Sequence, residues 1–145
     1  MNNMRSSKSV TLVIVEDDDG DFMSIERGLA KVRVINQHIR AKNGIEALEI
    51  LRGSADRQPL RRPYVVLCDL KMPKMDGLDM VTELRGDPAL RSTPVFMMTT
   101  SRHDEDRCRA YDLNVAGYII KSDAGKGFLS LIEMLGGYIQ VVELP

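Results

Sequence analysis

The sequence predicts one α/β domain in which a parallel sheet is covered on both faces by helices. Apolar runs of about strand length alternate with segments in which apolar residues recur every three or four positions. Glycines and prolines fall between these segments rather than inside them. The chain has 145 residues, which is enough for one domain with a buried core and too few for two ordinary domains. Strict alternation of strands and helices favours a parallel sheet between two helical layers.

Five apolar runs are the predicted strands. The first has five apolar residues out of six, and such a continuous run is typical of a strand that is buried on both faces. The second run is the weakest, and Pro94 opens the fourth. We expect strands at residues 10–15, 38–42, 64–68, 95–98 and 116–120.

Helical periodicity follows each of these runs. After the first, apolar residues recur at spacings of three and four from Phe22 to Val32, and Asp18 or Asp19 can cap the start of that helix. We expect the fifth helix to end at the Gly136-Gly137 pair. Apolar residues mark the inner faces of the other helices: Ile45, Leu48 and Leu51 in the second, Leu78, Val81 and Leu84 in the third, Cys108, Tyr111 and Val115 in the fourth, and Phe128, Leu131, Ile132 and Leu135 in the fifth.

The two ends of the chain differ in character. Residues 1–9 are polar and lack the apolar stretch of a secretion signal, so we expect a short disordered tail there. The folded domain is expected to span residues 10–135, followed by a C-terminal extension at residues 136–145 with several apolar side chains. Such a segment either folds back on its own domain or contacts a second copy of the chain. We favour a homodimer, because two-fold assemblies are the commonest.

Composition excludes several classes of partner. The chain has 20 basic and 21 acidic residues, a balance that does not favour nucleic acid or a membrane surface as the main partner. No apolar run is long enough for a transmembrane helix. Cys68 and Cys108 lie far apart in the sequence and do not have the spacing of a metal site. Two lone cysteines in such a chain are typical of a reducing compartment, so we expect a cytoplasmic protein.

Reactive side chains follow four of the five predicted strands. Glu16 and Asp17 follow the first strand, Asp69 the third, Thr99 the fourth and Lys121 the fifth. Because the carboxyl ends of parallel strands share one edge of the sheet, we expect these side chains to converge. Carboxylates brought together in this way need a cation between them. Their oxygens suit Mg²⁺, which prefers one or two carboxylates together with phosphate and water.

The same constellation suits phosphoryl transfer. A carboxylate such as that of Asp69 can act as a nucleophile and become an aspartyl-phosphate. A lysine ammonium and a threonine hydroxyl can bind the phosphoryl oxygens as negative charge spreads over them. Each feature taken alone has a plainer interpretation: the acidic run as a helix start, the hydroxyls from Thr99 to Ser101 as a helix cap, and Lys121 as a surface lysine. Their common position at strand ends favours the functional interpretation.

These residues also stand in the pattern of a known family. The pattern has an acidic pair after the first strand, Asp-x-x-Met-Pro-x-Met-Asp-Gly at residues 69–77, Pro-Val-x-x-x-Thr ending at Thr99, and Gly-Tyr-x-x-Lys ending at Lys121. With these motifs the chain resembles the receiver domain of two-component response regulators, over about residues 10–135. The resemblance implies a flavodoxin-like, doubly wound (βα)5 receiver fold with a five-stranded parallel sheet in the order 2-1-3-4-5.

The resemblance also implies an acceptor and a metal site. Asp69 matches the phosphoacceptor, which takes its phosphoryl group from a histidine kinase. Glu16 and Asp17 match the acidic pair that binds Mg²⁺, with Asp17 and Asp69 as carboxylate ligands. Lys71 matches the position whose backbone carbonyl completes the metal site.

Further positions match the parts of the family that respond to phosphorylation. Thr99 matches the switch hydroxyl, Tyr118 the aromatic residue that changes rotamer with it, and Lys121 the lysine that pairs with the phosphoryl oxygens. Thr100 takes the small-residue position beside the switch hydroxyl. The family usually has a cis Lys-Pro peptide after the fifth strand, whereas this chain has Lys121-Ser122. A cis bond before a residue other than proline costs about 2.5–4 kcal/mol, so a trans peptide is expected here.

From this resemblance we expect a stand-alone signalling switch and not an enzyme acting on other substrates. Phosphorylation would change the face formed by the fourth helix, the fifth strand and the fifth helix. The basic loop at residues 53–63 and the apolar C-terminal end resemble the small regulators that pair with bacterial phytochrome-type histidine kinases.

Three other functions share part of this pattern. A phosphatase of the haloacid-dehalogenase type needs a second Asp two residues after the nucleophile, where this chain has Lys71. A flavodoxin-like cofactor module needs a loop that cradles phosphate after the first strand, where this chain has four consecutive acids. A pseudo-receiver that binds partners without phosphorylation is disfavoured by the full set of site residues, and Ser122 leaves it open.

Overall fold

The computed structural model describes residues 9–32 and 37–145, so most of the predicted N-terminal tail lies outside the described residues. Five parallel strands form one sheet in the order β2-β1-β3-β4-β5. This confirms the predicted fold class and strand order. The strands are β1 (Thr11–Val15), β2 (Gln37–Ala41), β3 (Tyr64–Asp69), β4 (Val95–Thr99) and β5 (Gly117–Ile120).

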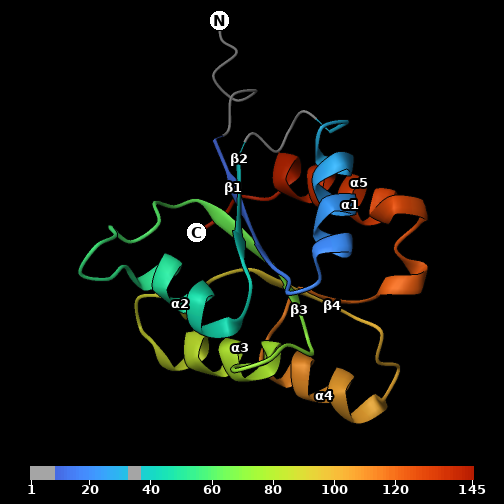
Figure 1. The fold of residues 1–145 in the computed structure, drawn as a ribbon. Helices are drawn as coiled ribbons and strands as arrows, with labels where there is room; N and C mark the ends of the chain where they lie inside the picture. Colours follow the sequence, from blue (N-terminus) through green and yellow to red (C-terminus); the bar gives the residue numbers. More distant parts are fainter. Residues whose placement is uncertain (1–8, 33–36) are drawn as a thin grey trace, which may run out of the picture.

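Helices cover both faces of the sheet (Figure 1). Helices α1 and α5 lie on one face, and α2, α3 and α4 lie on the other. Two short 3-10 turns, η2 and η3, connect β5 to α5. The helical elements are α1 (Asp19–Leu29), α2 (Gly44–Arg52), α3 (Gly77–Gly86), α4 (Asp104–Asp112), η2 (Lys121–Asp123), η3 (Lys126–Phe128) and α5 (Leu129–Val141).

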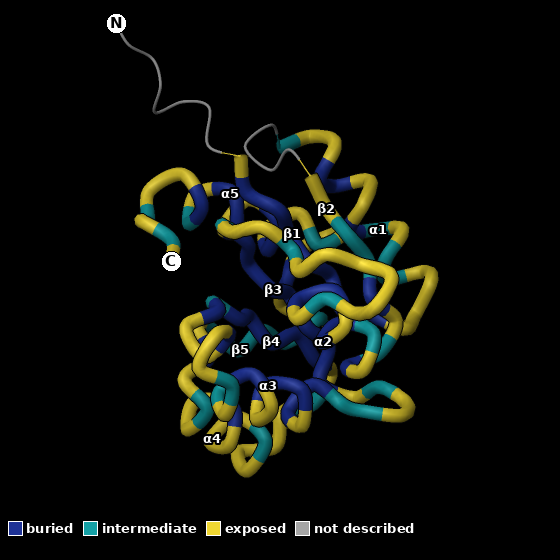
Figure 2. Tube along the Cα trace, turned by 90° about the vertical axis from the view of Figure 1, so that its left-hand side faces the viewer, coloured by how far each residue is buried: buried dark blue, intermediate teal, exposed yellow. Residues whose placement is uncertain are grey.

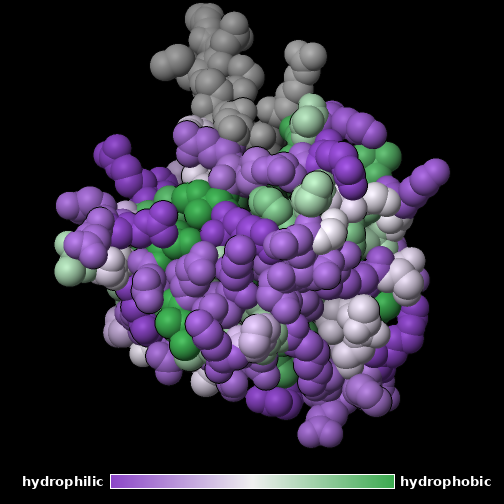
Figure 3. Space-filling view, in the orientation of Figure 1, coloured by the Kyte–Doolittle hydropathy of each residue, from purple (hydrophilic) through white to green (hydrophobic). Residues whose placement is uncertain are grey.

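The core lies where the continuous apolar runs predict it. Every residue of β1, β3 and β4 is buried, whereas the edge strands β2 and β5 are only partly buried. Figure 2 shows these buried central strands between helices whose outer sides are exposed. On the face drawn in Figure 3 the surface is mainly hydrophilic, with apolar side chains in small separate groups. Burial on both faces explains why these strands lack the alternation of a half-exposed strand.

Acidic or amide side chains cap three of the helices at the carboxyl edge of the sheet. Asp18 accepts a hydrogen bond from the backbone N–H of Asp21 at 2.7 Å, as one of the two predicted caps. Asn43 and Asp76 cap α2 and α3 in the same way, each at 2.9 Å. Each cap satisfies a helix N–H that has no partner within its helix and so fixes where the helix begins.

The predicted inner face of α4 is wrong. Cys108 is exposed and Tyr111 is 50% exposed, while Ala110 is the residue that α4 buries. Val115 is buried, but it lies beyond the end of the helix. Because α4 is short and otherwise polar, it contacts the core through one small side chain instead of an apolar stripe.

Helix α5 does not end at Gly136-Gly137 but continues to Val141. Ile139 is fully buried, and the ring of Tyr138 packs edge-on against Phe96 with ring centroids 5.0 Å apart. A Cβ atom added at Gly136 would lie 2.8 Å from a methyl carbon of Val32, so the glycine permits close packing near the end of α1. The start of the predicted extension therefore belongs to the domain and covers its core.

Arg85 joins α3 to two loops at the amino edge of the sheet. Its Nε donates to the carbonyl of Leu113 at 2.7 Å, and its Nη2 to that of Asn114 at 3.2 Å. Its Nη1 donates to the carbonyls of Arg91 and Thr93, at 2.8 and 2.9 Å. One guanidinium thus satisfies four backbone carbonyls of the loops that follow α3 and α4. Partial burial lowers the pKa of Arg85.

Candidate functional site

The predicted convergence of side chains at the carboxyl edge is confirmed. Asp69 is the last residue of β3, Glu16 follows β1, and Lys121 follows β5. The ammonium of Lys121 donates to Asp21 Oδ2 at 2.7 Å, to Glu16 Oε1 at 3.1 Å and to Asp69 Oδ2 at 3.2 Å. Residues more than 100 positions apart in the sequence therefore form one ionic cluster.

Three carboxylates at this edge offer oxygens that all lie within 4.8 Å of one another, and they belong to Glu16, Asp17 and Asp69. The side chains of Glu16 and Asp69 are only 0% and 9% exposed, whereas Asp17 is exposed. Close oxygen ligands with two of them buried fit a hard divalent cation. Glu16, Asp17 and Asp69, which were predicted as metal ligands, are thus brought together.

The pKa values at the site reflect a shortage of positive charge. Burial and the neighbouring charge of Asp69 raise the pKa of Glu16 to about 7. Burial also raises the pKa of Asp69, although Lys121 opposes that shift. For Lys121, burial by itself lowers the pKa, but the hydrogen bond to Asp21 and the charges of Asp69 and Glu16 outweigh it and raise the pKa. A second cation would relieve this repulsion between carboxylates.

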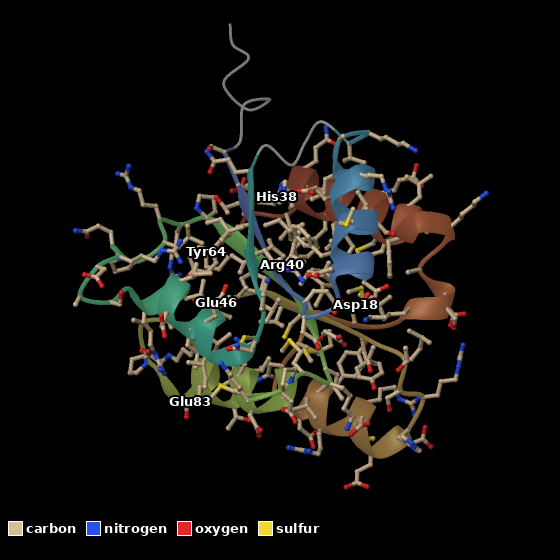
Figure 4. The ribbon with its side chains drawn as sticks, viewed as in Figure 1. Asp18, His38, Arg40, Glu46, Tyr64 and Glu83 are labelled. Atoms are coloured by element: carbon tan, nitrogen blue, oxygen red, sulfur yellow. The ribbon has the colours of Figure 1, made fainter. Side chains whose placement is uncertain are left out.

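Arg40, on β2, holds the acidic loop that follows β1. Its Nε donates to the carbonyl of Glu16 at 3.0 Å, and its Nη2 lies 2.8 Å from Asp19 Oδ1 in an ion pair. The guanidinium stacks over the ring of Phe22 at 4.5 Å. In Figure 4 the side chain of Arg40 lies on β2, beside the end of α1 where Asp18 is labelled. The sequence prediction missed Arg40. The signal that could have found it is a charged residue inside the strand that pairs with β1, the strand that the acidic run follows.

Thr99 and Tyr118 meet at the backbone of Ser101. The Thr99 side chain is fully buried, and its Oγ1 accepts a hydrogen bond from the N–H of Ser101 at 3.0 Å. The hydroxyl of Tyr118 donates to the carbonyl of Ser101 at 3.1 Å. The Ser101 hydroxyl in turn donates to Asp106 at 2.7 Å, at the start of α4. Movement of either predicted switch residue would therefore disturb the loop between β4 and α4.

Lys121 reaches the cluster without a cis peptide. Within the described residues the one cis peptide is Arg62-Pro63, so Lys121-Ser122 is trans, as expected. The chain turns into η2 at Lys121, and the hydroxyl of Ser122 accepts a hydrogen bond from Arg102 at 3.0 Å. The absence of proline has not moved Lys121 away from Asp69.

Gly77 closes the loop that begins at Asp69. Its N–H donates to the carbonyl of Leu70 at 2.9 Å. A Cβ atom added there would lie 2.4 Å from the carbonyl oxygen of Asp69, closer than folded structures allow. The glycine that ends the 69–77 motif is therefore required by this close approach of backbones.

Two predicted positions are less engaged in the site. The side chain of Lys71 is 66% exposed and lies 4.0 Å from Asp106 Oδ2, and its carbonyl as a metal ligand stays a prediction. Thr100 is exposed beside Thr99.

A cavity with a volume of about 580 Å³ lies away from this cluster. It is at the amino edge of the sheet, between the start of β1 and the C-terminal segment, and is lined by residues that include Arg61 and Leu144. It contains none of the clustered carboxylates, so the chemistry points to the carboxyl edge instead. Among the described residues, no helix has the length and apolar character needed to cross a membrane.

Comparison with known proteins agrees with this geometry. Residues 12–132 match the model of the response regulator receiver domain family. The chain is 27% identical to response regulator Rcp1 of Synechocystis over 141 residues, which cover 97% of this chain and 96% of Rcp1. Its structure is similar to that of the phosphorylated cyanobacterial phytochrome response regulator RcpA, with a TM-score of 0.86 and 29% identity over 95% of this chain and 99% of that one.

It is also similar to the Mn²⁺-bound form of Rcp1, with a TM-score of 0.83 and 27% identity over 93% of this chain and 98% of that one. The family match covers most of the chain and includes all four strand ends that carry the clustered side chains. The chain therefore belongs to the response regulator receiver domain family.

Proposed function

We propose that this protein is a phosphorylation switch of a two-component system, in which Asp69 accepts a phosphoryl group from a histidine kinase. The observation that carries the proposal is the position of Asp69. It ends β3 at the carboxyl edge, it is nearly buried, and one of its oxygens faces the Lys121 ammonium at 3.2 Å. A carboxylate held in this way beside a cation is suited to attack a phosphoryl group.

In the proposed step, an Asp69 oxygen forms a bond to the phosphorus of a phosphohistidine as the P–N bond breaks. The electron pair of that bond returns to the imidazole of the kinase, so atoms and charge balance. Lys121 faces the oxygens on which negative charge develops. The transfer is directed at Asp69 itself, so we propose that the chain is a signalling protein and not an enzyme acting on further substrates.

The metal is proposed to be Mg²⁺, held by Asp17, Asp69 and the carbonyl of Lys71, with Glu16 acting directly or through water. A bound divalent cation would supply positive charge between the carboxylates and the incoming phosphoryl oxygens. The close oxygens of Glu16, Asp17 and Asp69 support this assignment, as does the Mn²⁺-bound form of the relative Rcp1.

We propose that phosphorylation changes the surface formed by α4, β5 and α5, and that a partner binds this surface. A phosphoryl group adds about two negative charges and three acceptor oxygens at Asp69. We expect Thr99 to turn toward it and Tyr118 to follow, which removes both hydrogen bonds to Ser101 described above. Because Ser101 also contacts Asp106 of α4, the start of that helix would shift.

A phytochrome-type histidine kinase is the proposed partner, because the similar protein RcpA is a phytochrome response regulator. The cytoplasm is the proposed location, since the phosphodonor domain of such a kinase and the two free cysteines both fit a reducing compartment.

The test is labelling by a small phosphodonor such as acetyl phosphate, followed by mass spectrometry of the modified peptide. Wild-type protein should be labelled on Asp69 only when Mg²⁺ is present, and Asp69→Asn should not be labelled. Asp56→Asn, which removes an exposed carboxylate in the loop before β3, is the matched control and should be labelled normally. Labelling of Asp69→Asn at the same rate as wild type would reject the assignment. Phosphotransfer from a panel of labelled sensor kinases then identifies the cognate kinase.

We also propose a homodimer, formed through the C-terminal segment at residues 136–145. In this segment Val141 is 80% exposed, and Met134 on the same helix is 40% exposed. Truncation at Gly136 would not be a clean test, because it removes the buried Ile139. Sedimentation velocity should instead compare wild type with Val141→Glu. A dimer that dissociates in the variant supports the proposal, and monomeric wild-type protein at high concentration contradicts it.

A further inference from the structure

Asp21 makes the shortest of the three contacts to Lys121, and the roles proposed above do not use it. Its Oδ2 lies 2.7 Å from the Lys121 nitrogen, compared with 3.1 Å for Glu16 and 3.2 Å for Asp69. Asp21 belongs to the first turn of α1 and is not part of the group of carboxylates that could hold a metal. Its carboxylate therefore contacts the site through the ammonium of Lys121.

The number of donors on Lys121 makes this contact informative. A lysine ammonium has three N–H groups, and three carboxylates surround this one. Two of those carboxylates, Glu16 and Asp69, also belong to the candidate metal site. When they share their charge with a divalent cation, Asp21 is the carboxylate whose charge remains for Lys121 alone.

The backbone holds Asp21 firmly in this position. Its N–H donates to the capping carboxylate of Asp18 at 2.7 Å, so its place in the first helical turn is fixed. Its side chain is 33% exposed and that of Lys121 is 13% exposed, so the pair is only partly screened by water. The other partner, Lys121, is the first residue of η2 and precedes the trans Lys121-Ser122 peptide.

We propose that Asp21 is a positioning residue that holds the ammonium of Lys121 beside Asp69. This inference rests on the proposed phosphoryl transfer to Asp69. One N–H of Lys121 stays on Asp21, while the other two are free to follow the oxygens at Asp69 from the carboxylate to the phosphoryl group. Asp21, in the first turn of α1, thus determines the position of the Lys121 ammonium during phosphoryl transfer.

The experiment measures the rate at which acetyl phosphate labels Asp69 in the full chain at saturating Mg²⁺. Asp21→Asn keeps the size of the side chain but removes its charge, and the rate should fall about 3- to 10-fold, because one charge-assisted hydrogen bond to Lys121 is weakened. Asp21→Glu restores the charge and should recover most of the rate. Glu83→Gln, which removes an α3 carboxylate from a partly exposed ion pair with Arg52 of α2, is the matched control and should label at the wild-type rate.

A double-mutant cycle separates positioning from a general loss of stability. If Asp21 acts through Lys121, Asp21→Asn should have no further effect on the rate in a Lys121→Met background. Equal rate losses in both backgrounds, or a wild-type rate for Asp21→Asn, would overturn the role of Asp21. Absence of labelling on Asp69 in the wild-type chain would instead overturn the proposed function, so the two failures are distinguishable.

Discussion

Replacement of Glu16 by Gln should stabilise the metal-free protein at high pH. The side chain of Glu16 is fully buried, and burial and the charge of Asp69 raise its pKa from 4.5 to about 7. A raised carboxyl pKa means that the folded protein binds more protons than the unfolded chain between these pH values, so stability falls as the pH rises through this window. The difference of 2.5 units corresponds to at most about 3.4 kcal/mol at pH 8.

The gain from Glu16→Gln should therefore depend on pH. At pH 8 we expect Glu16→Gln to raise the free energy of unfolding by about 1.5–3 kcal/mol. Each kcal/mol corresponds to a rise in melting temperature of roughly 3 °C. At pH 5 Glu16 is already protonated in the folded protein, so the gain should drop below about 1 kcal/mol. With added Mg²⁺ at pH 8, wild type should be more stable than Glu16→Gln, because the cation stabilises wild type more than the variant.

Urea denaturation with EDTA or with Mg²⁺, at pH 5 and pH 8, checks these values. A variant that is less stable than wild type at pH 8 in EDTA would refute the reasoning, since the carboxylate would then contribute stability. The same gain at both pH values would show that the effect comes from packing and not from charge.

Two further substitutions test the fold around the site. Gly77→Ala places a Cβ atom 2.4 Å from the Asp69 carbonyl oxygen and 2.7 Å from Met97, so we expect a loss of about 2–4 kcal/mol in urea denaturation. Gly86→Ala, in the same helix with no atom within 4 Å, should instead gain about 0.5–1 kcal/mol, and equal effects of the two would contradict the clash. Arg85→Met removes the donors for four carbonyls and should cost about 2–4 kcal/mol, as measured by thermal unfolding. A loss below about 0.5 kcal/mol would show that water replaces the guanidinium.

Continuous patterns were the parts of the fold that could be predicted from sequence. The buried strands stand out because a run such as 10–15 has almost no polar interruption. The fourth helix was harder, because it buries a single alanine and its larger side chains face water, so its periodicity carries no information about the core. The fifth helix passes through Gly136-Gly137 because Ile139 gains burial beyond it, and that tertiary gain outweighs the low helix propensity of glycine.

The residues of the site also fall into a group that the sequence predicts and a group that it does not. Residues that end strands, such as Asp69 and Lys121, were predictable because topology alone brings strand ends together. Arg40 and Asp21 were missed, since each acts through a contact between side chains on different elements. Sequence spacing does not show which acid of a run faces which cation.

The four carbonyls bound by Arg85 have a consequence for how a signal could travel. Two of them, those of Leu113 and Asn114, anchor the segment just after α4 to α3, whereas Ser101 contacts Asp106 at the start of α4. The C-terminal end of α4 is therefore fixed more firmly than its N-terminal end. Displacement of α4 would then be largest around residue 104 and smallest around residue 113. A partner that responds to this displacement should therefore contact the N-terminal end of α4.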